Sequence, residues 1–286
     1  KDVVVDKESE IYEGAVLGPK VRVGAMSTIA PNTKVWPEKT ILSGTKLRGS
    51  VVWGNQEQGP VFVKHGIAGD IRGSLSPETL IQLGLSYGAF LGKNKRVLVT
   101  NDLSNVAELA KRALVVGLRG GGLDTLDGGE VVGRITRFAV QELALDGALH
   151  VGTDGGDPNT VFVECWDGRG RLLSRGDQRK LEGILLREDY PRFGAEDLGD
   201  HVQVAGLKKR YLQRLTRQYP SGTPGFKVGL VMDPPTDPFG ELVRDFLKRS
   251  GYLVVTERVD GLPTVVVQNQ NWFFQDENGA RLSTHD

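Results

Sequence analysis

The chain has 286 residues, and its 36 basic side chains equal its 36 acidic ones, so its formal net charge is zero. This balance excludes the basic excess typical of nucleic-acid binders, and no apolar run reaches the roughly 20 residues that a membrane span needs. We therefore expect neither a nucleic-acid nor a membrane partner. A single cysteine, Cys165, excludes an intrachain disulfide and favours a cytoplasmic location.

Large aliphatic residues recur every six residues at the start of the chain. They are Val5, Ile11, Leu17, Val23, Ile29, Val35, Ile41 and Leu47. This spacing fits neither the 3.6-residue period of a helix nor the two-residue period of a strand. It predicts a path that turns a corner every six residues and stacks each aliphatic on its counterpart one coil away. We expect this unit to cover residues 1–54, with a linker over residues 55–64 that contains Gly59 and Pro60.

Strands and helices alternate in the remainder of the chain. Helices are expected from Ser76, from Ser104 to about Leu118, and over residues 133–145, 175–187 and 238–249. Ser76, Ser104 and Ser174 are expected to be N-caps. Strands are expected over residues 97–99, 124–126, 148–151, 160–166, 226–232, 252–256, 264–267 and 272–274. The alternation predicts layered α/β domains with a largely parallel sheet. His150 falls in one of these strands, and we expect it to be a buried histidine with its hydrogen bonds satisfied.

The stretch from Ile67 to Gly73, followed by Leu75-Ser76-Pro77-Glu78, resembles the opening loop of the phosphoglucomutases and phosphomannomutases. Residues 147–167 and 170–180 resemble the segment that carries the phosphoserine loop of that family. The resemblance implies a first phosphohexomutase-like domain over residues 65–200. It also implies an incomplete second domain with the start of a third over residues 201–286.

A second resemblance includes the repeat. Residues 35–37 (Val-Trp-Pro) and 50–54 (Ser-Val-Val-Trp-Gly), together with the loop at Asp70, resemble a fused bacterial mannose-1-phosphate guanylyltransferase. The repeat itself is similar to the left-handed parallel β-helix of hexapeptide-repeat proteins. Together these resemblances imply a mixed fold class: a short left-handed parallel β-helix followed by α/β phosphohexomutase-like layered domains.

The phosphoserine loop of the family is altered in this chain. Its place is taken by Thr153-Asp154-Gly155-Gly156-Asp157-Pro158, which contains no serine. Asp154 aligns with the serine, and a carboxylate cannot serve as a hydroxyl phosphoryl carrier. We therefore expect no catalytic residue here and interpret Thr153, Asp154 and Asp157 as vestigial positions. An alignment shifted by one residue would make Thr153 the carrier.

The magnesium loop of the family is altered as well. The resemblance implies carboxylates between the strands at residues 264–267 and 272–274, where this chain has Gln268-Asn269-Gln270-Asn271. Neutral amides lack the charge that Mg²⁺ requires to give up its water. We expect no metal and no cofactor. Arg72 could still bind an anion beside its glycine-rich turn, although an ion pair with a nearby carboxylate is the competing interpretation.

These observations lead to a functional hypothesis. We expect an inactive, non-catalytic oligomerisation and regulatory C-terminal module of a mannose-1-phosphate guanylyltransferase-like protein, assembled as a homo-oligomer. One alternative is a divergent phosphohexomutase that uses Thr153 or Asp154. Another is a sensor that binds a sugar phosphate or nucleotide sugar through Arg72, Thr153 and Asp154.

Overall fold

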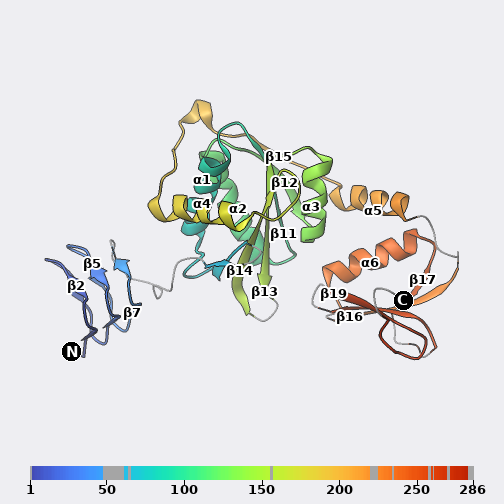
Figure 1. The fold of residues 1–286 in the computed structure, drawn as a ribbon, viewed down its shortest axis with the longest axis horizontal. Helices are drawn as coiled ribbons and strands as arrows, with labels where there is room; N and C mark the ends of the chain where they lie inside the picture. Colours follow the sequence, from blue (N-terminus) through green and yellow to red (C-terminus); the bar gives the residue numbers. More distant parts are fainter. Residues whose placement is uncertain are drawn as a thin grey trace.

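The structure is a computed structural model. It describes residues 2–47, 61–63, 66–154, 157–219, 225–233, 235–256, 259, 261–268 and 271–282. The expected linker lies outside these ranges apart from residues 61–63, which form a strand. Figure 1 shows short N-terminal strands, a central sheet covered by helices, and a smaller C-terminal sheet.

Residues 2–47 form short strands of two residues each. These are β1 (Val4–Val5), β2 (Glu10–Ile11), β3 (Val16–Leu17), β4 (Arg22–Val23), β5 (Thr28–Ile29), β6 (Lys34–Val35), β7 (Thr40–Ile41) and β8 (Lys46–Leu47). They pair in parallel with strands 18 residues along the chain, so that Val5 lies opposite Val23 and Val23 opposite Ile41. The aliphatic side chains are buried from Val23 onward and more exposed before it: Val23 and Ile41 are 0% exposed, whereas Val5 is 43% exposed.

A seven-stranded sheet forms the centre of the chain, in the order β15-β12-β11-β13-β14-β10-β9. Its strands are β9 (Val61–Val63), β10 (Gly66–Asp70), β11 (Arg96–Asn101), β12 (Asp124–Glu130), β13 (Gly147–Asp154), β14 (Asp157–Asp167) and β15 (His201–Gln203). Strands β15, β12, β11 and β13 are parallel neighbours, and β14, β10 and β9 continue the sheet in antiparallel pairs. The sheet is therefore mixed, with its parallel part built by helical crossovers.

Helices cover both faces of this sheet. Helices α1 (Pro77–Leu91), α2 (Asn105–Gly120) and α4 (Arg175–Arg187) share one buried core with Val97 and Val99 of β11. Helix α3 (Gly133–Glu142) packs on the other face, where Leu98 points. The alternation along β11 follows from the two-residue period of a strand, and both faces of a central strand are apolar because both are covered.

The helix starts follow the predicted caps in three cases. Ser76, Ser104 and Ser174 each accept a hydrogen bond from a backbone N–H in the first turn of the following helix. These caps satisfy donors that would otherwise have no partner. Helix α3 differs, because Val132 precedes it and offers no side-chain acceptor.

The C-terminal unit is a four-stranded sheet in the order β17-β16-β18-β19. It contains β16 (Lys227–Asp233), helix α6 (Pro238–Arg249), β17 (Leu253–Val255), β18 (Thr264–Gln268) and β19 (Asn271–Gln275). Helix α5 (Leu207–Gln218) packs on α3 and α6, and the apolar side chains of α3, α5, α6 and β18 form one buried cluster.

A 3-10 turn covers Ala195–Asp197. No helix in the described part of the chain has the length and apolarity to cross a bilayer.

The fold class expected from the sequence, a short left-handed parallel β-helix followed by α/β domains, is wrong: the chain has an α/β fold with parallel and mixed sheets. The two larger sheets and their helices contain most of the buried core, whereas each N-terminal strand supplies only two residues. The physical reason for the error is that a six-residue spacing specifies which aliphatics stack. It does not specify the class of the whole chain or the hand of the path.

Candidate functional site

Thr153 lies near the carboxyl end of β13, beside the loop that follows β11. Its hydroxyl Oγ1 donates to Oδ2 of Asp102 at 3.1 Å, and its backbone N–H donates to the same oxygen at 2.7 Å. The other oxygen of Asp102 accepts the backbone N–H of Ser104 at 2.8 Å. The carboxylate is thus fixed from two loops, with one oxygen on the threonine hydroxyl. Such a pair has the form of a hydroxyl nucleophile with an adjacent base.

The loop that contains Arg72 lies at the same end of the sheet as Thr153. Thr153 is paired with Val161, which is paired in turn with Gly69 of β10. Asp70 ends β10 and accepts from Nε of Arg72 at 3.0 Å. The pKa of Asp70 is lowered, chiefly by this side-chain hydrogen bond from Arg72. Of the two interpretations of Arg72, the ion pair with Asp70 is present, and the Arg72 side chain is 69% exposed.

Asp157 is the first residue of β14, and its side chain accepts hydrogen bonds from residues that follow it closely in the chain. Its carboxylate accepts the backbone N–H of Asn159 at 3.0 Å and the hydroxyl of Thr160 at 2.8 Å. The hydrogen bond from Asn159 is the largest cause of its lowered pKa, and nearby Asp70 acts against it. Asp154 is paired with Asp157 through the backbone. Gly155 and Gly156 lie outside the described residues, as does the Asp154 side chain.

The family resemblance implies a magnesium ion, and the donor set of this chain does not fit one. The amide of Gln268 donates to Asp233 at 3.2 Å, and Asn269 and Gln270 lie outside the described residues. Neutral amides are poor ligands for Mg²⁺, and within the described ranges no three histidine, cysteine or acidic side chains gather to hold a metal. The absence of a metal and a cofactor stays a prediction, and no chemical step below uses one.

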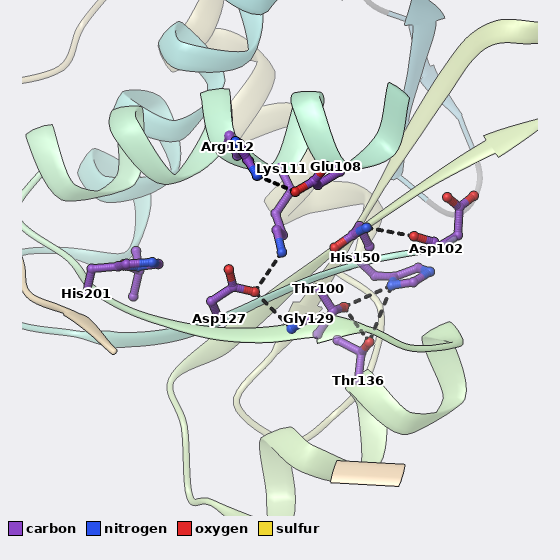
Figure 2. A network of polar contacts seen from close by, with 12 residues as sticks. Thr100, Asp102, Glu108, Lys111, Arg112, Asp127, Gly129, Thr136, His150 and His201 are labelled. Atoms are coloured by element: carbon purple, nitrogen blue, oxygen red, sulfur yellow. Dashed lines mark hydrogen bonds and ion pairs between the residues drawn. The ribbon is translucent and has the colours of Figure 1, made fainter. Parts of the chain in front are cut away.

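A buried polar network lies on the other face of β13 and was only partly foreseen. Figure 2 shows Nδ1 of His150 beside Thr100 and Thr136. Thr100 Oγ1 lies 2.9 Å from that nitrogen and 2.7 Å from Oγ1 of Thr136. Burial lowers the pKa of His150 to about 4, so the ring is neutral at pH 7. The histidine is buried as expected, but its hydrogen bonds to Thr100 and Thr136 use Nδ1 alone, so the expectation of satisfied hydrogen bonds is met only in part. The two threonine partners are far away in sequence and could not be identified from it.

A second polar cluster, also in Figure 2, joins α2 to β12, which is separated from β13 by β11. Lys111 of α2 donates to Asp127 of β12 at 2.7 Å, and the same carboxylate oxygen accepts the backbone N–H of Gly129 at 2.8 Å. Both side chains are largely buried, at 7% and 16% exposed. A cavity of about 240 Å³ lies nearby and is lined by Asp102 and His150, among others.

Part of the chain is similar to known proteins in sequence. Residues 59–192 match the domain family described as phosphoglucomutase/phosphomannomutase, alpha/beta/alpha domain I. A protein named probable phosphoglucosamine mutase from Pyrococcus furiosus is 29% identical over 56% of this chain and 35% of its own length. One of the same name from Pyrococcus abyssi is 25% identical over 71% of this chain and 44% of its own length. The chain therefore spans less than half of each of these relatives.

Solved structures show the same fold. A phosphoglucomutase/phosphomannomutase family protein from Burkholderia thailandensis superposes with a TM-score of 0.65 and 17% identity, covering 77% of this chain and 55% of that one. A structure from Thermus thermophilus gives a TM-score of 0.63 and 18% identity, covering 80% of this chain and 59% of that one. Both likenesses concern the α/β fold, and they overturn the expected β-helix class.

The comparisons also correct the functional hypothesis. The expectation of a non-catalytic oligomerisation and regulatory module of a mannose-1-phosphate guanylyltransferase-like protein is wrong, because the matched domain family and the relatives are phosphohexomutases. The error has a simple origin. The guanylyltransferase resemblance depended partly on short stretches at residues 35–37 and 50–54, which lie before the matched region, and residues 50–54 also lie outside the described ranges. Its third part, the loop at Asp70, lies within the region that matches the phosphohexomutase domain family.

Proposed function

We propose that this chain is part of a phosphohexomutase, in which Thr153 accepts a phosphoryl group from a hexose phosphate. The observation that carries the proposal is the hydrogen bond from Thr153 Oγ1 to Asp102 Oδ2 at 3.1 Å. The domain family matched by residues 59–192 supports the reaction class. The names of the relatives favour a hexosamine phosphate as the first substrate to test.

The reaction requires the threonine hydroxyl to lose its proton as it attacks phosphorus. The carboxylate of Asp102 takes that proton while the bond from Thr153 Oγ1 to phosphorus forms. The bond from phosphorus to the sugar oxygen breaks, and the proton passes from Asp102 to that leaving oxygen. No redox change occurs, and the reverse step returns the phosphoryl group to another hydroxyl of the sugar.

Arg72 supports this proposal as a positioning group for the substrate. Its guanidinium is exposed on the loop beside β14 and is anchored by Asp70. Guanidinium groups bind phosphate oxygens through paired N–H donors. In this proposal Arg72 contacts the phosphate that is not transferred. A homo-oligomer and a cytoplasmic location remain further parts of the proposal.

The test is transfer of label to the protein from a radiolabelled hexosamine or hexose 1,6-bisphosphate. We expect Thr153→Ser to retain labelling and Thr153→Ala to abolish it, because only the serine variant keeps a hydroxyl at this position. Thr40→Ala, at an exposed threonine of β7, is the matched control and should label as the unsubstituted chain does. Equal labelling of Thr153→Ala and the unsubstituted chain would refute the proposal. Saturable binding of the bisphosphate without labelling would favour the sensor alternative instead.

A further inference from the structure

The N-terminus of α3 opens into a cavity that no step above uses. The cavity measures about 350 Å³ and adjoins the 240 Å³ cavity beside Asp102, with which it shares Val132, Gly133 and His150. Val132 offers no side-chain acceptor to the first turn of α3. Free N–H groups and the helix dipole make such a terminus favourable for an anion.

Two polar side chains converge on Gly133, the first residue of α3. A Cβ atom at this position would lie 2.8 Å from Oε2 of Glu164 and 3.7 Å from Nε2 of His150. His150 and Glu164 are also directly paired across β13 and β14, so their side chains lie on the same face. The carboxylate, the imidazole edge and the helix terminus therefore meet at one point, and the glycine leaves that point open.

Neither side chain uses its polar atoms fully within the described residues. His150 is 4% exposed, and its hydrogen bonds to Thr100 and Thr136 involve Nδ1 alone, which leaves Nε2 without a partner there. Glu164 is half-buried and has no hydrogen bond or ion pair among those residues; burial alone raises its pKa to about 7. Both groups therefore keep hydrogen-bonding capacity that a ligand in the cavity could use.

The remaining polar groups of the cavity favour an oxyanion. Arg134 and Arg137 of α3 line it, and Arg134 is anchored by stacking on Phe239 at 4.8 Å. Trp166 also lines the cavity, and its buried Nε1–H has no acceptor within the described ranges. Glu164 differs from these donors, because an ionised carboxylate repels an anion unless the two share a proton.

We propose that this cavity binds hydrogen phosphate at the N-terminus of α3, with Glu164 accepting the proton that the phosphate carries. The backbone N–H groups, His150 and the two arginines bind the other oxygens. The carboxylate makes the site selective for an oxyanion that carries a proton. Sulfate carries none, and a phosphate monoester loses its last proton near pH 6.

The neighbouring charges set the pH dependence. Glu164 faces His150 across the sheet and Arg134 and Arg137 on α3. The adjoining cavity adds Asp102, Glu130, Lys208 of α5 and Glu241 of α6. Below a pH of about 7 Glu164 carries its own proton and can donate it to any oxyanion. Above that pH only a ligand with a proton avoids the repulsion, so sulfate binding falls as the pH rises while phosphate binding persists.

The experiment measures binding of inorganic phosphate, sulfate and methyl phosphate, a monoester without a sugar, to the intact chain by calorimetry at pH 6 and pH 8. At pH 8 we expect phosphate to bind at least about tenfold more tightly than either comparator. This factor corresponds to the one hydrogen bond that the proton of hydrogen phosphate makes to Glu164. At pH 6 the three affinities should converge. Glu164→Gln should remove the discrimination at pH 8, because the amide can donate to sulfate, and Glu142→Gln at the exposed end of α3 is the matched control.

Gly133→Ala provides a second test, since its methyl group would occupy the meeting point. We expect it to abolish phosphate binding while circular dichroism shows a folded chain; if it fails to fold, Glu164→Gln alone decides. The proposal is overturned if phosphate does not bind at millimolar concentrations, or if Glu164→Gln leaves the preference for phosphate over sulfate unchanged. Because the readout is binding rather than phosphoryl transfer, this outcome is independent of the role of Thr153.

Discussion

Thr153 and His150 lie on the same strand, β13, but their surroundings differ. Thr153 is near the carboxyl end of the strand, where its hydroxyl and its N–H both contact Asp102. His150 is buried on the face covered by α3, with one ring nitrogen bonded and the other without a partner among the described residues. The first arrangement is complete and suited to proton transfer. The second is incomplete and suited to a ligand, so one strand carries two different kinds of site.

The largest expected effect concerns the buried ion pair between Lys111 of α2 and Asp127 of β12. Lys111→Met should lower the free energy of unfolding by about 3–5 kcal/mol, because it leaves the carboxylate of Asp127 buried without its charge partner. Urea denaturation measures the change. Lys180→Met, in the exposed pair with Asp177, is the control and should cost less than about 1 kcal/mol. Equal costs for the two variants would show that burial does not distinguish the two pairs.

The buried histidine should make stability depend on pH. Its pKa is lowered to about 4 in the folded chain, against an ordinary value of 6.5. The stability that this neutral ring contributes is present above pH 6.5 and is lost as the pH falls through 4, amounting to about 3 kcal/mol. A His150→Gln variant should show a flatter profile over this range in chemical denaturation. An unchanged slope would show that His150 is not the titrating group.

Glu164 should produce a dependence at higher pH. Its pKa is raised from 4.5 to about 7 by burial. The stability associated with its protonated form is fully present below pH 4.5 and is lost as the pH rises through 7, a change of about 2–3 kcal/mol. Glu164→Gln should therefore be relatively more stable than the unsubstituted chain at pH 8. Saturating phosphate should reduce this stability difference if the cavity binds it. A stability difference that phosphate leaves unaltered would show that Glu164 titrates without taking part in phosphate binding.

The smallest expected effect concerns the capped and uncapped helices. Ser104→Ala should destabilise the chain by about 1 kcal/mol, because the N–H of Ala107 loses its acceptor. Thermal unfolding measures this loss of stability, and Ser174→Ala, which removes the cap of α4, is measured alongside it. Phosphate should stabilise both variants as much as the unsubstituted chain, since neither cap belongs to α3. Loss of the phosphate effect in Ser104→Ala would place the anion at α2 instead.

Local features of the fold could be predicted from the sequence. The caps at Ser76, Ser104 and Ser174 are confirmed, and so are the helices Arg175–Arg187 and Pro238–Arg249. These elements carry their signals within a few residues. The bounds of helix α5 were not predicted, because it starts after Gly206 without a side-chain cap and packs on α3 and α6.

The sites depended on contacts between distant residues and were harder to predict. Asp102 and Thr153 are 51 residues apart, and the role of the aspartate follows only from the order of β11 and β13 in the sheet. The pairing of His150 with Glu164 requires the register of β13 and β14, which a bulge near Thr153 alters. One available signal was the apolar Val132 at a helix start, where a capping residue is usual.

The most direct test of the central claim is to locate the phosphoryl group after incubation of the unsubstituted chain with a hexosamine 1,6-bisphosphate. Tandem mass spectrometry of the digested protein identifies the modified residue. We predict one phosphothreonine, at Thr153, that survives hydroxylamine and is strongly reduced in Asp102→Asn. A hydroxylamine-sensitive acyl phosphate on Asp154, or a chain that remains unmodified while the bisphosphate is consumed, would contradict the assignment of Thr153 as the phosphoryl acceptor.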